Sequence, residues 1–593
     1  MDLLDDLDPA QRAAVTSQAA PLAILAGAGS GKTRALTRRI AYRVHTGEAE
    51  AGHVLAVTFT RKAAGELRNR LHALGVDGAT VGTFHALAWA QLRRRALDDG
   101  RWAPAILRDK ARLVPRHVAT RIERAKAQGI GPAGDPDYEH YEAEKRRLGL
   151  LDFDDLLLHC AQAVEDDPAF AKALRWRFRH FFVDEYQDVN PLQFRLLRAW
   201  LGDRLDLTVV GDPNQSVYGW NGADPTLLAR FAEHFPTAES ARLDTNYRST
   251  GAIVTVAASV LPEATGGAGP PRPPRHADRP GASVPTVRAC DTERDEADAV
   301  ARAVRLARAP GTPWSDIAVL VRTNAQLRLL EAAFRARAIP HASPGNAWLR
   351  TTETRAALRA LVDTPPAVPF RSAVKDLTTE PLAELAAEYQ RFDRAPSGPG
   401  FVSWLHAVVR PHDRDGQGNA VTLATFHGAK GLEWPTVFVA GLEDGLVPVA
   451  GGDDDEERRL LYVALSRAVT SLHCSWAAER NGRARQPSPW LADIEAAVAA
   501  VAAVAAPAPV ALRPRRCPPK GDGDAVLDAL RRWRANQAKA ARVPAAAVVP
   551  DAVLAAVARA RPTTPGELQA VLGPMKAAAF GPSLLAVVAG AGS

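Results

Sequence analysis

The chain has 593 residues, of which 47% are hydrophobic and 24% are charged, so it is long enough for three or more domains and several cores. Lys and Arg outnumber Asp and Glu by 74 to 67, a mild basic excess that fits a polyanionic partner but also an ordinary basic surface. The four cysteines lie far apart and form no Cys-x-x-Cys pair, so we expect reduced thiols and no zinc.

No targeting or membrane segment is expected. The first six residues are acidic, where a signal peptide would be positively charged. The run 496–512 is almost all Ala and Val, is interrupted by Pro507 and Pro509, and predicts a helix end followed by a linker. We therefore expect a cytoplasmic protein without a membrane partner.

Strands and helices alternate at the start of the chain. Residues 22–25 predict a buried strand entering a glycine-rich loop, and residues 33–44 predict the helix leaving it. Residues 53–59 and 62–74 predict the next strand and helix. Such alternation is typical of a parallel sheet covered by helices on both faces. From residue 86 to 179 the pattern is helical and highly charged, which indicates an insertion.

The α/β pattern resumes at residues 181–183 and 207–210 and continues in a second region. Residues 261–285 are rich in Pro and Gly and predict an exposed loop. A helical insertion of about 75 residues interrupts the second α/β region, a linker follows it, and residues 521–593 predict a compact helical tail. The strands expected in the second region cover 317–321, 421–425, 437–440 and 472–476.

The segment 26–33, AGAGSGKT, has the character of a phosphate loop. Backbone N–H groups at a helix N-terminus point at one anion in such a loop. Lys32 is expected to reach the β- and γ-phosphates, and the Thr33 hydroxyl is expected to bind Mg²⁺. The residues expected to line the phosphates are Ala28, Gly29, Ser30 and Gly31.

Two adjacent carboxylates end a second apolar strand, in the segment 183–188, VDEYQD. Asp184 is expected to hold magnesium through its water shell, and Glu185 is expected to orient and deprotonate the attacking water. Together with the phosphate loop, this pair predicts a nucleotide-hydrolysing enzyme.

The segment Asp-Glu-x-Gln-Asp resembles the second motif of superfamily 1 DNA helicases, and Ala26 in place of the first P-loop glycine is usual in the UvrD/Rep/PcrA type. Three more segments resemble motifs III, IV and VI of that type, at residues 210–220, 246–249 and 457–468. The resemblance implies that Gln215 senses the γ-phosphate, Arg248 contacts it and Arg467 is the arginine finger. An arginine from a second domain makes hydrolysis wait for domain closure.

Other motifs of the family frame the adenosine. Residues 7–11 resemble the Q motif, in which Gln11 would read the adenine edge. By the same resemblance Tyr247 would stack on the adenine and Arg34 would pack on its other face. Residues 424–434 resemble motif V, which implies that Glu433 lies near the ribose and His427 nearer to DNA.

A DNA track needs aromatic faces for bases and polar groups for phosphates. The residues placed just past strand ends beside the ATP motifs are Phe59, His85, Tyr218 and Trp220. Aromatic residues in a chain of this size are usually core residues, and it is this placement that favours a DNA role. Asn221 stands where relatives often carry Arg, which implies a weaker phosphate contact.

The resemblance covers about residues 1–490 and implies two RecA-like P-loop domains with parallel sheets, each carrying a helical insertion. Residues 521–593 resemble an all-α HRDC domain, with Arg531, Arg532, Arg534 and Lys539 as candidates for nucleic-acid contact or for a solvated helix face. UvrD-type motors with such a tail are known in actinobacteria. The expected parts are the first α/β domain (1A, 1–85 and 180–248), the first helical insertion (1B, 86–179), the second α/β domain (2A, 249–345 and 416–490), the second helical insertion (2B, 346–415), a linker (491–520) and the HRDC-like domain (521–593).

The resemblance implies an ATP- and Mg²⁺-dependent DNA helicase that moves 3′ to 5′ on single-stranded DNA, unwinds tailed duplexes and works with repair proteins at the nucleoid. The short second insertion and Asn221 favour the alternative of a translocase that displaces bound proteins with little unwinding. A non-enzymatic, ATP-gated clamp recruited through the tail is the third interpretation, and the complete set of Lys, Glu and Arg motifs argues against it. No nuclease-like acidic cluster follows the motor motifs.

Overall fold

The structure is a computed structural model that separates into two compact units, residues 1–506 and 507–593. The residues that it describes are 3–98, 105–107, 109–219, 222–262, 276–279, 283–308, 311–342, 351–365, 368–375, 377, 380–393, 395–408, 418–505, 523–541, 544–572 and 574–590.

The first α/β domain contains a parallel sheet of six strands in the order β3-β2-β6-β7-β1-β8. Side chains alternate between its faces: Phe181 and Val183 join one hydrophobic core, and Phe182 joins the other. The apolar run before the two carboxylates is therefore a central strand buried on both faces. The strands are β1 (Leu22–Ala26), β2 (Val54–Thr58), β3 (Thr80–Thr83), β6 (His180–Val183), β7 (Leu207–Gly211) and β8 (Glu239–Leu243).

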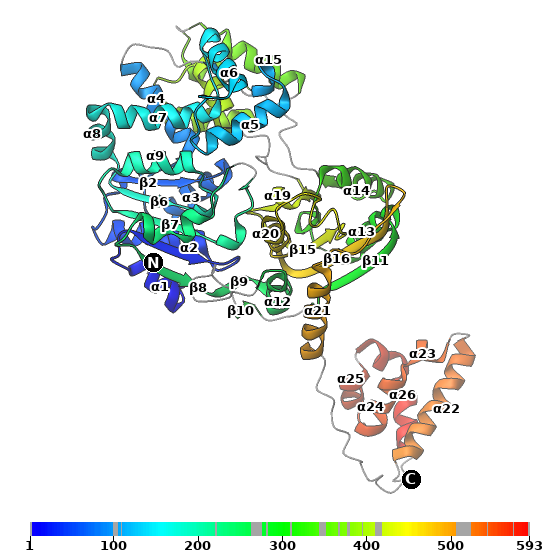
Figure 1. Ribbon diagram of the computed structural model, residues 1–593. Coiled ribbons are helices and arrows are strands. Elements are labelled where there is room, and N and C mark those ends of the chain that lie inside the picture. The colour runs from blue at the N-terminus through cyan, green and yellow to red at the C-terminus, as the bar shows by residue number, and fades with distance from the viewer. Residues whose placement is uncertain are drawn as a thin grey trace. The chain divides into compact units, whose positions relative to one another are not determined.

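Helices cover both faces of this sheet (Figure 1). The cores on the two faces draw on different helices, with α2 on one face and α9 on the other. Asp8 caps the first helix in a capping box with Gln11, which places both side chains beside the glycine-rich loop. The helices of this domain are α1 (Pro9–Thr16), α2 (Lys32–His45), α3 (Arg61–Ala73), α9 (Pro191–Leu201), α10 (Thr226–Ala229) and α11 (Phe231–His234).

The first helical insertion is helical as predicted, except for a short parallel ladder between β4 (Ala105–Ile106) and β5 (Leu150–Leu151). Two of its buried lysines, Lys126 and Lys145, are neutralised by Asp152 and Asp155, so the charged pattern of this segment includes an internal ion network. The helices are α4 (Phe84–Asp98), α5 (Arg116–Ala127), α6 (Pro136–Leu148), α7 (Phe153–Asp166) and α8 (Pro168–Arg177).

The second α/β domain contains a sheet in the order β11-β16-β15-β12-β14-β13, parallel throughout, with β17 paired antiparallel to β16. Its strands are β11 (Thr286–Thr292), β12 (Ile317–Val321), β13 (His341–Ala342), β14 (Val421–Thr425), β15 (Trp434–Ala440), β16 (Ala468–Arg480) and β17 (Arg483–Ala484). Its helices are α12 (Gly251–Ser259), α13 (Glu293–Ala307), α14 (Asn324–Ala336), α19 (Phe426–Ala429) and α20 (Asp454–Leu465). A small parallel ladder joins β9 (Thr245–Thr250) to β10 (His276–Arg279). Of these two strands β10 lies in the range 261–285 predicted to be an exposed loop, and most of that range lies outside the described residues.

The second helical insertion consists of α15 (Thr352–Val362), α16 (Phe370–Ala373), α17 (Glu380–Phe392) and α18 (Gly398–Val408). Although it interrupts the sequence of the second α/β domain, it lies against the first helical insertion (Figure 1). Helix α18 contacts α4.

The predicted linker begins too early. Residues 491–505 form a helix, α21 (Leu491–Ala505), and its residues Leu491 and Ile494 are buried in the core of the second α/β domain. Its apolar residues therefore pack against α12 and do not form a linker. Residues 506–522 lie outside the described residues.

The second compact unit is all-α, as predicted. Its core surrounds Trp533, whose ring meets Phe580 edge-on at 5.8 Å. Its helices are α22 (Gly523–Ala541), α23 (Ala545–Val548), α24 (Asp551–Ala560), α25 (Pro565–Leu572) and α26 (Pro574–Gly590). Across the described part of both units, no helix has the length and apolar character needed to cross a membrane.

Candidate nucleotide and DNA site

The glycine-rich loop has a conformation that only its glycines allow. Gly29 and Gly31 have φ values of +71° and +84°. A Cβ at Gly31 would come within 2.8 Å of the Gln11 Nε2 atom. That Nε2 donates a hydrogen bond of 2.9 Å to the Ser30 carbonyl, so Gln11 braces the loop. The loop leads into α2, whose free N–H groups begin at Lys32, and such a helix start can bind an anion.

The acidic pair lies directly beside the start of α2. The Thr33 hydroxyl donates to Asp184 Oδ2 at 3.2 Å, so both predicted magnesium ligands point at one place. Burial and the neighbouring Glu185 charge raise the pKa of Asp184 to about 7, and the charge of Lys32 opposes this rise. A hydroxyl and a crowded carboxylate that share one position fit Mg²⁺, because the cation would relieve the repulsion between the carboxylates.

Glu185 is held in a strained backbone conformation, with φ of +54°. Gln187 Nε2 donates to Glu185 Oε2 at 2.5 Å. Burial would raise the pKa of Glu185, but the charges of Lys32 and Lys430 and the hydrogen bond from Gln187 hold it below its ordinary value. The carboxylate is therefore ionised, as a base for water requires, and the charge of Lys32 acts on it.

Gln215 joins the two α/β domains. Its Nε2 donates to Asp212 Oδ2 at 2.7 Å, and its Oε1 accepts a hydrogen bond of 3.1 Å from Arg467 Nη2. Arg467 is only 1% exposed, and burial together with the nearby Arg248 charge lowers its pKa to about 9. Arg248 itself pairs with Glu433 at 2.5 Å. The structure thus brings together the two predicted arginines, the predicted sensor and the predicted ribose contact.

The predicted adenine residues meet near the N-terminus of the chain. The Tyr247 hydroxyl donates to Asp8 Oδ2 at 2.5 Å, and the Tyr247 N–H donates to the Gly29 carbonyl at 2.8 Å. Arg34 donates to the Asp6 carbonyl at 2.6 Å. Gln11 is bonded to Asp8 as well as to the loop, so all three predicted residues border one region. Their contact with a base stays a prediction.

The DNA candidates fall into two groups. Phe59 and His85 pack on aromatic neighbours, Phe84 and Phe153, and His85 is 7% exposed. Tyr218 and His427 come from different α/β domains and lie with ring centroids 6.5 Å apart. Trp220 and Asn221 lie outside the described residues. A base-stacking role is best supported for the Tyr218 and His427 pair and stays a prediction for all of these residues.

The sequence did not indicate that residues of the second α/β domain bind the loop that follows β7 in the first. Lys430 Nζ donates to both Asp188 oxygens, at 2.7 and 2.6 Å, and to the Gln215 carbonyl at 2.6 Å, and it lies over the Tyr218 ring. Arg459 donates to the Ser216 carbonyl at 2.8 Å. Lys430 and Asp188 lie inside recognised motifs, but only their tertiary pairing shows what they do.

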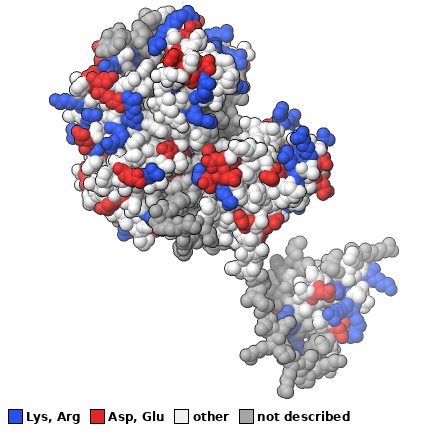
Figure 2. Space-filling model, viewed as in Figure 1, with Lys and Arg blue, Asp and Glu red and all other residues white. Residues whose placement is uncertain are grey.

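Glu456 adds another contact, since it accepts a hydrogen bond of 3.1 Å from the Gly219 N–H. It belongs to the acidic first turn of α20, which Figure 2 shows as a red patch and which suits the positive end of the helix dipole. Asn246 was also missed as a site residue: its Nδ2 donates to the Ala28 carbonyl at 2.9 Å. This bond ties the phosphate loop to the strand that carries Tyr247 and Arg248.

In the C-terminal unit the four basic candidates differ. Arg534 is half-buried and bonds to the Val549 carbonyl and to Asp551, so it joins α22 to the start of α24. Arg531, Arg532 and Lys539 are exposed and lie on α22. Figure 2 shows basic side chains on this unit. Only the three exposed residues remain candidates for a partner contact.

A phosphate loop on one sheet that meets buried arginines from a second sheet is the arrangement of a two-domain P-loop nucleotide hydrolase. Residues 7–130 and 135–236 match the UvrD/REP helicase N-terminal domain, and residues 241–362 and 406–479 match the UvrD-like helicase C-terminal domain. Residues 524–588 match the HRDC domain. The chain therefore belongs to the UvrD/Rep helicase family, as the motifs predicted.

Named relatives agree with this assignment. The chain is 38% identical to the ATP-dependent DNA helicase UvrD2 of Mycobacterium tuberculosis, over 99% of each chain. It is 30% identical to DNA helicase II of Escherichia coli, over 81% of this chain and 85% of that protein. It is 28% identical to the ATP-dependent DNA helicase PcrA of Staphylococcus epidermidis, over 83% of this chain and 87% of that protein. The chain is thus a helicase of the UvrD/PcrA type.

Proposed function

We propose that this chain is an ATP-dependent DNA helicase that uses Mg²⁺, moves 3′ to 5′ on single-stranded DNA and unwinds tailed duplexes in DNA repair or replication at the nucleoid. Family membership and the names of the relatives support ATP and DNA as substrates. The observation that carries the proposal is the contact between Gln215 and Arg467. It links the hydrolysis site to the loop that also carries Tyr218.

The chemistry of hydrolysis follows from the positions of the side chains. Thr33 and Asp184 would hold Mg²⁺, which neutralises charge on the phosphates when bound. Glu185 takes the proton of the attacking water, and Lys32 binds the transferring phosphoryl group. Arg467 and Arg248 stabilise the charge that develops there, and Arg467 reaches the site only when the second α/β domain is docked.

The coupling to DNA follows from the same loop. Gln215 contacts the arginine of the second domain, and Tyr218, three residues later, lies against His427 of that domain. A change in the nucleotide that moves Arg467 therefore also moves the aromatic pair. Stacking of one base on an aromatic side chain is worth about 1–3 kcal/mol. A movement of Tyr218 and His427 that breaks and remakes their stacking on bases can therefore shift the strand.

Hydrolysis and unwinding are tested together. ATP turnover is measured with and without single-stranded DNA, and unwinding is measured on duplexes with a 3′ or a 5′ tail. We expect turnover stimulated by DNA and unwinding of the 3′-tailed duplex only. Unwinding of the 5′-tailed duplex alone would reverse the assigned polarity, and absence of stimulation by DNA would refute the proposal.

Variants assign the residues. Lys32→Ala and Glu185→Gln are each expected to abolish DNA-stimulated turnover, because one removes the phosphate cation and the other the base. Matched controls are Lys172→Ala and Glu239→Gln, exposed residues of the same types on α8 and β8. Full turnover in Lys32→Ala or Glu185→Gln would refute the role given to that residue.

A second candidate, a translocase that displaces bound proteins with little unwinding, is favoured by the packing of the second helical insertion on the first. Stimulated turnover without unwinding of either tailed duplex would select this candidate. Displacement of a protein bound to single-stranded DNA is the direct measurement of it. The two candidates share the ATP site and differ only in what the movement does.

A further inference from the structure

The second helical insertion shares one hydrophobic core with the first. Tyr389, Phe401, Trp404 and Leu405 of the second insertion are each at most 1% exposed in this core. The buried side chains that the first insertion contributes are Ala86, Trp89, Ile106 and Leu156. A continuous core of this kind is the mark of one folding unit, not of two domains that touch at a polar surface.

Direct contacts cross between the two insertions. Helix α18 packs against α4 and also touches β4. The rings of Trp89 and Tyr389 meet edge-on, with centroids 5.9 Å apart. Moving one insertion away from the other would expose both of these aromatic side chains to water.

A buried ion pair crosses the same boundary. Arg93 Nε donates to Asp393 Oδ2 at 3.3 Å, and the two side chains are 4% and 1% exposed. The Tyr389 hydroxyl donates to the same Asp393 oxygen at 2.5 Å. Sliding one insertion along the other would part these charges while they stay buried, and a buried charge without its partner is unfavourable, so the pair resists sliding.

The second insertion is also tied to the first α/β domain itself. Arg61, at the start of α3, pairs with Glu388 of α17 at 3.2 Å, and both side chains are mostly buried. Among the described residues, no helix of the second insertion contacts an element of the second α/β domain to a comparable extent. By chain connectivity the insertion belongs to the second α/β domain, but by its packing it belongs to the first.

We propose that the second helical insertion is a fixed part of the first α/β domain and its helical insertion. When the second α/β domain opens and closes on the nucleotide, it moves past this insertion, which does not swivel with it. The inference does not depend on the direction of movement along DNA.

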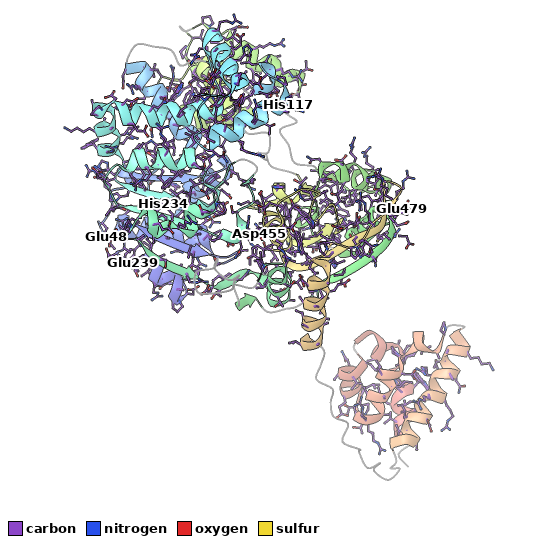
Figure 3. All side chains as sticks on the ribbon, viewed as in Figure 1. Glu48, His117, His234, Glu239, Asp455 and Glu479 are labelled. Carbon is purple, nitrogen blue, oxygen red and sulfur yellow. The ribbon has the colours of Figure 1, made fainter. Side chains whose placement is uncertain are left out.

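Single-molecule energy transfer on the full chain tests the inference. His117 of α5, Arg355 of α15 and Glu479 of β16 are exposed, and Figure 3 labels the first and the last. Dyes are attached in pairs after His117→Cys, Arg355→Cys or Glu479→Cys. Cys290→Ser is added because the Cys290 thiol is partly exposed and would compete for dye, and Cys517→Ser is added because Cys517 lies outside the described residues. Each pair is measured alone, with single-stranded DNA, and with DNA plus a non-hydrolysable ATP analogue.

We expect the 117–355 pair to give one transfer efficiency in all three conditions. Any change at the 355–479 pair is expected to be accompanied by a change at the 117–479 pair. A shift at 117–355 when DNA or nucleotide is added would overturn the inference, because the insertion would then move against the first domain. The energy-transfer measurement needs no ATP hydrolysis. A failure of the proposed helicase activity would therefore leave this test valid, and the two failures could be told apart.

A variant identifies the contact that holds the insertion. Asp393→Ala removes the buried carboxylate, and the 117–355 distribution is expected to broaden or to gain a second population. Asp363→Ala, an exposed residue of the same type at the end of α15, is the matched control and is expected to change nothing. An unchanged 117–355 distribution in Asp393→Ala would show that the ion pair does not hold the insertion in place. Whether the insertion is fixed at all is decided by the 117–355 measurement on the chain that keeps Asp393.

Discussion

Replacing Lys430 by methionine tests whether the domain-spanning lysine both stabilises and couples the motor. Lys430 is the cation that faces the buried Asp188, and the two side chains are 6% and 2% exposed. Burial raises the pKa of Asp188 to about 6 even with Lys430 present. Lys430→Met therefore leaves an uncompensated buried carboxylate, which costs about 3–5 kcal/mol in comparable buried pairs.

The cost depends on pH in a defined direction. Because the folded-state pKa of Asp188 is raised above the unfolded value of about 3.9, its ionisation opposes folding as the pH rises through that window. Loss of Lys430 raises that pKa further. The destabilisation is therefore expected to be small near pH 5, where the carboxyl is protonated in the variant, and to approach its full size at pH 8. Denaturant unfolding at both pH values measures it.

The double variant Lys430→Met with Asp188→Asn is the control, because it removes the stranded charge while keeping the shape of the side chain. It is expected to recover most of the stability at pH 8. The loss of a charge-assisted hydrogen bond to the Gln215 carbonyl, worth about 1.5–3 kcal/mol, is not recovered by this change. We therefore expect DNA stimulation of ATP turnover to fall roughly tenfold in both variants. Equal instability of the single and double variants at pH 8 would refute the reasoning.

Three further predictions concern single features. Arg467→Lys is expected to lower kcat for ATP by about 10³–10⁵, because a lysine cannot keep both the Gln215 contact and the phosphoryl contact, and steady-state turnover measures it. Gly31→Ala is expected to abolish nucleotide binding, measured by calorimetry, because its φ is +84° and the new Cβ meets Gln11 at 2.8 Å. Burial would raise the pKa of Asp206, but hydrogen bonds from Arg43 and His180 hold it well below its ordinary value. The stability that Asp206 contributes is therefore present above its unfolded pKa of about 3.9 and is lost as pH falls below it, so the acid midpoint of unfolding is expected to change in Asp206→Asn.

The central strands could be predicted because they are buried on both faces. Residues 22–25, 181–183 and 317–321 are apolar without interruption, and the structure has strands at each. The strands at the sheet edges were missed. Residues 286–292 form β11 with mostly exposed or half-exposed side chains, so their sequence carries no apolar run. The strand pairs with β16 through its backbone, which the side-chain pattern does not record.

The candidate site was predicted where the chemistry is local and missed where it is tertiary. Lys32, Thr33 and Asp184 follow from two short motifs, and the structure brings them together. The pairing of Lys430 with Asp188 joins residues far apart in the chain, and nothing near either one indicates it. The packing of the second helical insertion was hidden for the same reason, since chain order assigns it to the second α/β domain and its contacts are with the first.

Many contacts between the two α/β domains fall on one segment, the loop that follows β7. Its backbone is held by Lys430, Arg459 and Glu456, and its Gln215 side chain by Arg467, all from the second α/β domain. These bonds fall on Gln215, Ser216 and Gly219 of one short segment, so a rotation of the second domain is expected to displace the segment as a unit. If only the Gln215 side chain were held, the loop could relax and leave Tyr218 where it was. Because the Gln215 and Ser216 carbonyls and the Gly219 N–H are held as well, we expect the nucleotide state and the position of Tyr218 to change together.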